Sequence, residues 1–448
     1  MAQYKCNKCE AILKSGEGSS TRSCSLCGSS DISLITYTEE EIINSKIKLD
    51  ECYHGIIDIL KYYIDTTEQN YKFISMWIIG TYFHEQFKTF PYLFFNAMRG
   101  SGKTRTLKLI SSLAAKGDGS VQNNLTEAVL FRIPRGTTTC IDEVEQIGSK
   151  EKQTIRELLN SAYKRGMKVK RMKKANVMNK ETGTREEKQI VETFEPYFPI
   201  VMANIWGVEE VLADRSIVLV LEKSNNPGKV KKVEDFENND TICLLKRTLE
   251  GLVSLVSVSL AEKDYMKKWN LYIHNKYNDI TTLTTQTTQT TQTTLEEIEV
   301  GEFFNKIDDS GISGRNFELL LPLLIIAKEI GDCVFEEFLE IAKEVVDKKK
   351  DEEYANSKDV SLIEFISTLS YEGLTYFKLK DLVGRFRMFI GESDEEDRWL
   401  NDKWLGRALV RLNLLTDKRR LATGREVMLN YNKAIEQIKM FKSEGVKK

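Results

Sequence analysis

Two kinds of hydrophobic pattern divide the chain. In residues 38–88, and again from residue 297 onward, apolar residues recur at helical spacing; Ile56, Leu60 and Ile64, for example, fall on one side of a helix. Between residues 89 and 222, short apolar runs alternate with amphipathic segments. Helical segments are therefore expected on both sides of a central region of a different kind.

The central region carries apolar runs of strand length. They are Tyr92–Phe95, Thr137–Ile141, Phe194–Asn204 and Ile217–Leu221. Strands that alternate with helices predict a parallel sheet with helices on both faces. The expected fold class is therefore α/β.

The first run leads into AMRGSGKT, residues 97–104. A buried strand, a glycine-rich turn and Lys-Thr opening a helix are typical of the phosphate-binding loop (P-loop) of a nucleoside triphosphatase, because glycines let backbone N–H groups point at phosphates. Ala97 replaces the usual first glycine, which mainly serves the turn into the loop. A turn that binds nothing is the alternative. The residues expected to bind MgATP are Gly100, Ser101, Gly102, Lys103 and Thr104. Lys103 would reach the β- and γ-phosphates, and the Thr104 hydroxyl would bind Mg²⁺.

The second run ends in two carboxylates, Asp142 and Glu143, about forty residues after the loop. An acidic pair after a strand is usually a solvated strand end. Beside a phosphate loop, however, the first carboxylate can join the magnesium shell and the second can orient the attacking water. We expect Asp142 to help bind MgATP and Glu143 to be catalytic.

Four of the eight cysteines form two Cys-x-x-Cys pairs with fourteen residues between them. This spacing is typical of tetrahedral zinc and is favoured over disulfides inside a cell. The expected ligands of a structural Zn²⁺ are Cys6, Cys9, Cys24 and Cys27. The others, Cys52, Cys140, Cys243 and Cys333, are predicted to be buried small apolar residues.

Length and composition limit the class of protein. A chain of 448 residues can hold two to four domains, and no apolar run reaches the roughly 18 residues that a membrane span needs. The N-terminal residues lack a signal-peptide pattern, so we expect a cytoplasmic protein without a membrane partner. With a net charge of −2, nucleic-acid affinity has to come from local basic patches.

A basic segment lies between the acidic pair and the third apolar run. Seven cations occur in eleven residues, and a turn is expected near Gly183, which together predict a β-hairpin. Such a hairpin can track a single-stranded phosphate backbone, although a charge run is more often a solvated face. The candidate nucleic-acid contacts are Lys168, Lys170, Arg171, Lys173 and Lys174.

Residues 361–431 resemble a winged helix. A helix over Phe377–Ile390 and a second over Asp402–Leu412 precede two basic strands around Gly424. A basic helix followed by a basic wing suits DNA, while docking of a protein is the alternative. Lys403, Arg407 and Arg411 are the candidate DNA contacts on the second helix.

The sequence divides into expected domains. They are a zinc ribbon (1–37), a helical segment (38–88), the P-loop ATPase core (89–222), a helical segment (223–280), a Thr/Gln-rich flexible linker (281–296), a helical lid-like segment (297–357) and a mainly helical winged-helix-like domain (358–435).

These motifs together resemble the P-loop helicase domain of phage and plasmid primase–helicase proteins, a branch related to the AAA+ ATPases. The resemblance covers about residues 73–222 and 310–430 and includes Leu125–Arg132, Leu159–Gly166 and Ala213–Ser216 besides the loop and the acidic pair. No primase catalytic domain is visible upstream, so priming is not implied.

The resemblance implies further roles. Asn204 is a catalytic sensor that positions water against the γ-phosphate, where a turn-forming asparagine is the alternative. Arg215 is an arginine finger for a neighbouring subunit of a ring, with an intramolecular pair to Asp214 as its alternative. Arg315 is a second nucleotide-sensing arginine. The expected function is an ATP-dependent DNA helicase or translocase in the replication of a plasmid, virus or integrated element; the rival is a switch or loader that binds DNA without unwinding it.

Overall fold

The computed structural model divides the chain into two compact units, Met1–Lys343 and Glu344–Lys448. The structure describes residues 3–6, 12–14, 30, 32–34, 38–123, 126–130, 133–134, 136–142, 153–178, 185–205, 210–278, 295–356, 358–369, 375–391, 400–421 and 424–443.

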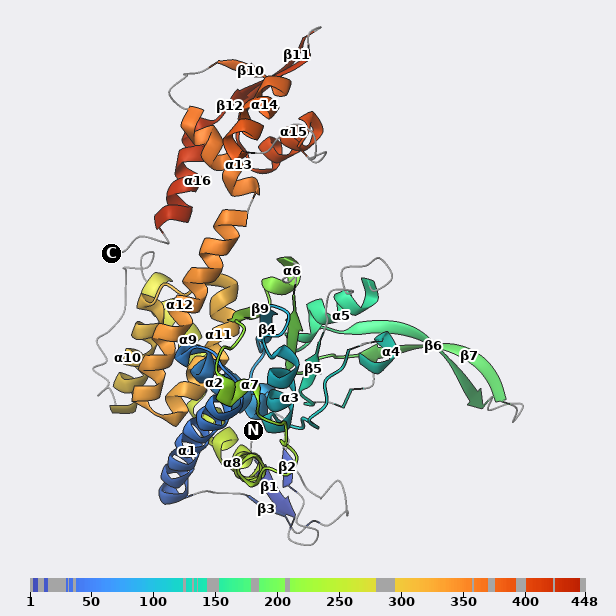
Figure 1. Cartoon of the computed structure of the whole chain (residues 1–448), viewed down its shortest axis with the longest axis vertical. Coiled ribbons are helices and arrows are strands. Elements are labelled where there is room, and N and C mark those ends of the chain that lie inside the picture. Colours follow the sequence, from blue (N-terminus) through green and yellow to red (C-terminus); the bar gives the residue numbers. More distant parts are fainter. Residues whose placement is uncertain are drawn as a thin grey trace, which may run out of the picture. The chain divides into compact units, whose positions relative to one another are not determined.

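A four-stranded parallel sheet organises the first unit (Figure 1). Its strand order is β5-β8-β4-β9, so neighbours in the sheet are not neighbours in the sequence. All three pairings are parallel, and therefore the carboxyl ends of the strands share one edge. The bounds are β4 Tyr92–Ala97, β5 Thr139–Ile141, β8 Ile200–Asn204 and β9 Ser216–Leu221. The predicted α/β class is confirmed.

Both faces of this sheet are buried at β4, β5 and β8, as the unbroken apolar runs predict, whereas Val220 of the edge strand β9 is exposed. Tyr92, Phe94 and Met202 pack on one face in a core cluster that also contains Leu158 and Leu159 of α5 (Gln153–Ala162). Side chains alternate along a strand, so the intervening residues of β4 and β8 face the other side. There α3 (Lys103–Leu113) contacts β5 and β8.

The helices before the sheet begin where the sequence offers caps. Thr38 and Glu41 form a capping box at the start of α1 (Glu39–Tyr63), and Thr67 caps α2 (Glu68–Phe83). Most of α2 is buried, including Trp77. Its aromatic residues therefore belong to the core.

The remaining elements of the first unit are mostly helical. Glu329 of α11 is buried and accepts hydrogen bonds from Ser259, Tyr265 and Lys263, which ties α11 to α8 and α9. The bounds are β1 Gln3–Cys6, β2 Ile12–Lys14, β3 Ile32–Leu34, η1 His84–Gln86, α4 Glu127–Leu130, α6 Glu210–Ala213, α7 Pro227–Val230, α8 Asp240–Lys263, α9 Tyr265–Asn278, α10 Leu295–Asp309 and α11 Gly314–Ile330; α12, Asp332–Asn356, crosses the boundary between the units.

The basic segment forms the predicted hairpin. Strands β6 (Val169–Met178) and β7 (Arg185–Phe194) pair antiparallel from Val169 opposite Phe194 to Met178 opposite Arg185. The ribbon extends away from the sheet (Figure 1). The expected turn near Gly183 lies outside the described residues.

The second unit combines helices with a three-stranded antiparallel sheet of order β10-β12-β11. Both predicted basic strands are present, and Asn401 caps the predicted second helix by accepting from the Lys403 and Trp404 N–H groups. Strand β10 was not predicted, because two of its three residues fall within the helix expected from Phe377 onward. The bounds are α13 Lys358–Thr368, β10 Tyr376–Lys378, α14 Leu379–Ile390, α15 Asp402–Arg411, β11 Leu415–Leu421, β12 Gly424–Leu429 and α16 Tyr431–Ser443.

The remaining predictions concern the Thr/Gln tract, the other four cysteines and membrane spans. The Thr/Gln tract lies outside the described residues, and α10 begins directly after it. Cys52 and Cys140 are buried as predicted and Cys243 is half-buried, but the prediction for Cys333 is wrong because it is exposed in the first turn of α12. No helix within the described part of the chain is long and apolar enough to cross a membrane.

Candidate nucleotide and nucleic-acid sites

The loop between β4 and α3 adopts the backbone that its glycines allow. Gly100 has a φ of 82° and Gly102 a φ of 83°, a left-handed region that other residues rarely adopt. Ala97 is instead the last residue of β4, paired with Leu221 in regular parallel register. Alanine is therefore tolerated at this position, because a strand residue needs no positive φ.

The start of α3 is open to an anion. Gly102 is the residue before the helix and has no side chain that could accept the first N–H groups. These N–H groups have no partner within the helix, and they carry the positive end of the helix dipole. A loop with this geometry can bind phosphate through its backbone.

Three predicted residues meet at the carboxyl edge of the sheet. Lys103 Nζ lies 3.2 Å from Asp142 Oδ1, and the Thr104 hydroxyl donates a hydrogen bond of 2.6 Å to Asp142 Oδ2. Asp142 is only 3% exposed. One buried carboxylate thus connects the cation and the hydroxyl of the loop, although 38 residues separate it from Thr104.

The Thr104 and Asp142 oxygens fit a Mg²⁺ ion. Two ligands on neighbouring positions of an octahedral ion lie about 3.0 Å apart when each Mg–O distance is about 2.1 Å. The two oxygens, which are 2.6 Å apart, need to separate by only about 0.4 Å. Both groups are hard oxygen donors, which Mg²⁺ prefers.

Asn204 is placed beside the loop strand. It ends β8 and stands in register with Asn96, the residue before Ala97. Its side chain is buried, and its Oδ1 accepts a 2.6 Å hydrogen bond from the N–H of Ile205. Glu143, the expected catalytic carboxylate, lies outside the described residues, directly after Asp142.

A cation that was not predicted, Lys223, also lies at this edge. The Lys223 side chain lies against the phosphate loop, its Cε 3.9 Å from the position that a Gly100 Cβ would occupy. Lys223 follows β9 by two residues. The sequence feature that could have indicated Lys223 is its position just past the end of β9, the strand that pairs with β4.

The structure places Arg215 and Arg315 at the other edge of the sheet. Arg215 immediately precedes β9, and its carbonyl accepts from the N–H of Tyr92, the first residue of β4. Arg315 lies in the first turn of α11 and contacts Asp214. A six-residue strand spans about 20 Å, so neither arginine is brought to the phosphate loop of its own chain.

The hairpin presents exposed cations beside exposed apolar residues. Lys168 and Lys170 are exposed near its base. Met172 faces Val191 across the ribbon, and their exposed fractions are 60% and 59%. The backbones of Arg171, Lys173 and Lys174 lie in β6, but their side chains are outside the description.

The basic residues of α15 differ from one another. Lys403 is exposed, as is Arg407. Arg411 is also exposed, but its Nη2 donates to both carboxylate oxygens of Asp359, at 2.6 and 2.8 Å. Arg411 therefore faces outward as predicted, but it is also bonded to α13.

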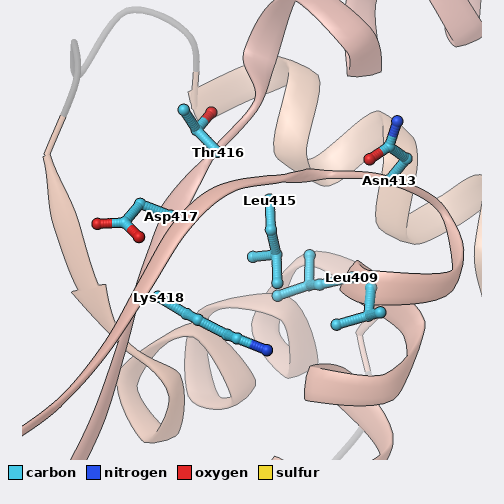
Figure 2. Close-up of a pocket in the computed structure, with 7 residues that line it drawn as sticks. Leu409, Asn413, Leu415, Thr416, Asp417 and Lys418 are labelled. Carbon is cyan, nitrogen blue, oxygen red and sulfur yellow. The ribbon is translucent and has the colours of Figure 1, made fainter.

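A cavity of about 280 Å³ opens in the second unit, where the end of α15 meets β11 (Figure 2). Leu409 and Leu415 form its apolar side, and Lys418 extends across it (Figure 2). The residues that line it are Leu409, Val410, Asn413, Leu415, Thr416, Asp417 and Lys418. None of the predicted nucleotide-binding residues lines this cavity.

The zinc prediction lies almost entirely outside the described residues. Only the backbone of Cys6, in β1, is described, while Cys9, Cys24 and Cys27 are not. Within the described part of the chain, no group of three or more His, Cys, Asp or Glu residues is arranged to hold a metal.

No protein-family model matches the chain, and no curated protein sequence does so. Among solved structures, SCCmec type IV Cch, described as an active helicase, has 12% identity and a TM-score of 0.32, covering 92% of this chain and 72% of the other. The apo C-terminal region of NrS-1 has 10% identity and a TM-score of 0.27, covering 88% and 76%. TM-scores this low do not establish a shared fold.

Proposed function

We propose that the protein is an ATPase that uses hydrolysis to move along DNA, as a helicase or translocase serving replication of a plasmid, virus or integrated element. The observation that carries the proposal is the meeting of Lys103 and Thr104 with the buried carboxylate of Asp142. This meeting occurs directly after a glycine loop that opens an uncapped helix.

In the proposed site the backbone of Gly100, Ser101 and Gly102 surrounds the phosphates. Lys103 turns from Asp142 to the β- and γ-phosphates, and Lys223 adds a second cation beside the loop. Thr104 and Asp142 hold Mg²⁺, which supplies charge neutralisation of the phosphates when bound. These residues together bind and orient MgATP.

Hydrolysis needs a water molecule aimed at the γ-phosphate. We assign its orientation to Glu143, which follows Asp142, and its positioning to Asn204 on the neighbouring strand. Arg215 lies at the edge of the sheet opposite the loop. We therefore assign it to a nucleotide on another copy of the chain, in a closed homo-oligomer in which each subunit completes its neighbour's site.

The nucleic-acid surfaces are assigned by exposure and charge. Lys168, directly before β6, and the cations of β6 contact the backbone of single-stranded DNA. The exposed apolar pair Met172–Val191 offers bases a surface for van der Waals contact. In the second unit, Lys403 and Arg407 of α15 and the strands β11 and β12 form a winged-helix-like surface for DNA. The four N-terminal cysteines hold a structural Zn²⁺ that folds the small N-terminal module.

A forked DNA substrate tests this function. The proposal predicts ATP-dependent separation of the strands by the wild-type chain and none by Lys103→Ala, with Lys108→Ala, from the same helix, as the matched control. Binding and hydrolysis without any strand separation, on forks of either polarity, would instead identify a loader or switch.

A further inference from the structure

A tyrosine ring joins the two arginines at the amino edge of the sheet. Tyr163 follows α5, and the Cζ atoms of Arg215 and Arg315 lie 5.3 and 5.1 Å from its ring centroid. Arg315 Nη1 also donates a 2.8 Å hydrogen bond to the Tyr163 hydroxyl. The two guanidinium groups therefore share one aromatic partner.

The two arginines differ in their other partners. Arg315 forms ion pairs with two carboxylates, Asp214, with 3.3 Å between Nε and Oδ2, and Glu318. The negative groups around Arg315 more than offset burial, which alone would lower its pKa, and the pKa is raised. Arg315 is thus held as a charged group inside its own chain.

Arg215 is bonded mainly to neutral acceptors. Its guanidinium donates to the main-chain carbonyls of Asn160, at 3.1 Å, and Val211. The Asp214 carboxylate, next in the chain, lies 3.9 Å from its Nη1, longer than a hydrogen bond. Charge-assisted bonds to carboxylates are stronger than bonds to neutral carbonyls. Arg215 can therefore leave its partners for a phosphate more readily than Arg315 can.

Arg215 and Arg315 compete for the carboxylate of Asp214. It lies between the two guanidinium groups, and Arg315 holds it at the shorter distance. If Arg315 were absent, its hold on this carboxylate would be lost, and Asp214 could approach Arg215, its neighbour in sequence, more closely than the present 3.9 Å. A guanidinium paired with a carboxylate is poorly able to offset charge on a phosphate.

We propose that Arg315 is a positioning residue for Arg215: by holding Asp214 and Tyr163, it keeps Arg215 available for the nucleotide of a second copy of this chain. This inference rests on the proposed role of Arg215 as a finger. It replaces the expectation that Arg315 senses nucleotide directly.

Suppression by a second substitution tests the inference. ATP hydrolysis and ATP affinity are measured for Arg315→Ala, Asp214→Asn and the double variant, each checked for melting temperature and oligomer size. We expect Arg315→Ala to lower kcat by about tenfold or more with little change in ATP affinity. The double variant should recover kcat to within about threefold of Asp214→Asn alone, because the competing carboxylate is gone. Arg315→Lys, which keeps a cation, should recover part of the activity.

Two comparisons keep the result interpretable. Lys276→Ala, which breaks a comparable pair with Asp308 on the outside of the same unit, should leave kcat unchanged. A raised Kd for ATP in Arg315→Ala, with no recovery by Asp214→Asn, would overturn the inference and return Arg315 to nucleotide contact. A wild-type kcat in Arg215→Ala would be a different failure. It would show that Arg215 is not an arginine finger, and would therefore overturn that part of the proposed function.

Discussion

Lys103 and Thr104, adjacent residues of one helical turn, both bind Asp142, one through each carboxylate oxygen. This arrangement gives the loop lysine a structural partner as well as a proposed phosphate partner. The two roles can be separated because stability and hydrolysis are measured independently.

Removing the Lys103 side chain should affect both ATP hydrolysis and the stability of the fold. Lys103→Ala should abolish ATP hydrolysis and lower the free energy of unfolding by about 3 kcal/mol, since a buried carboxylate loses its cation. Urea denaturation and steady-state hydrolysis measure the two effects. Lys108→Ala is the control: its pair with Glu234 is partly exposed, so the loss should not exceed about 1 kcal/mol. Wild-type hydrolysis by Lys103→Ala would contradict the site.

The hairpin prediction concerns charge at the base of β6. Lys168→Glu combined with Lys170→Glu should remove stimulation of hydrolysis by single-stranded DNA, measured as the ratio of rates with and without DNA. The slope of log affinity against log salt should become shallower by about 1.4, because two phosphate contacts are lost. Lys48→Glu with Lys267→Glu, exposed on α1 and α9, is the control. An equal loss in both pairs would indicate only a nonspecific charge effect.

In the second unit, the three basic residues of α15 are predicted to differ. Lys403→Ala and Arg407→Ala should each weaken DNA binding about two- to tenfold, whereas Arg411→Ala should have a smaller effect because Arg411 is bonded to Asp359. Fluorescence anisotropy with a labelled duplex at fixed salt measures these affinities. Arg411→Ala as the most damaging of the three would show that the ion pair opens on DNA.

His84 should make stability depend on pH. Burial lowers its pKa from 6.5 to about 4, so between these values the unfolded chain binds more protons than the folded one. Stability is therefore retained above pH 6.5 and lost as the pH falls towards 4. From pH 7.5 to 5.0 the contribution of His84 is about 2 kcal/mol.

Urea denaturation at these two pH values checks the prediction. Between these pH values, the free energy of unfolding of His84→Gln should fall by about 2 kcal/mol less than that of the wild type. His54→Gln provides the control, since that side chain is 60% exposed. Equal pH dependence in the wild type and His84→Gln would contradict the assignment.

Local chemistry made the nucleotide loop predictable. Gly100 and Gly102 occupy the left-handed conformations that only glycine adopts readily, and the strand before them is an unbroken apolar run. The meeting of Thr104 with Asp142 was also expected, because carboxyl ends of parallel strands share an edge. The hairpin followed from its charge and turn pattern.

Other features depended on packing between distant segments. Arg315 lies 101 residues from Asp214 in the sequence, and only the position of α11 brings them together. No pattern in one sequence indicates which edge of the sheet such a helix approaches. The pair Arg411–Asp359 was missed for the same reason: outward spacing on a helix does not reveal a partner on another helix.

The most direct test of the central claim is ATP hydrolysis by the purified chain, with and without single-stranded DNA, beside Glu143→Gln. The account predicts hydrolysis that DNA stimulates strongly, and a variant that still binds ATP but has lost both the basal and the stimulated rate. Hydrolysis that DNA does not change, or a Glu143→Gln variant with wild-type turnover, would contradict it.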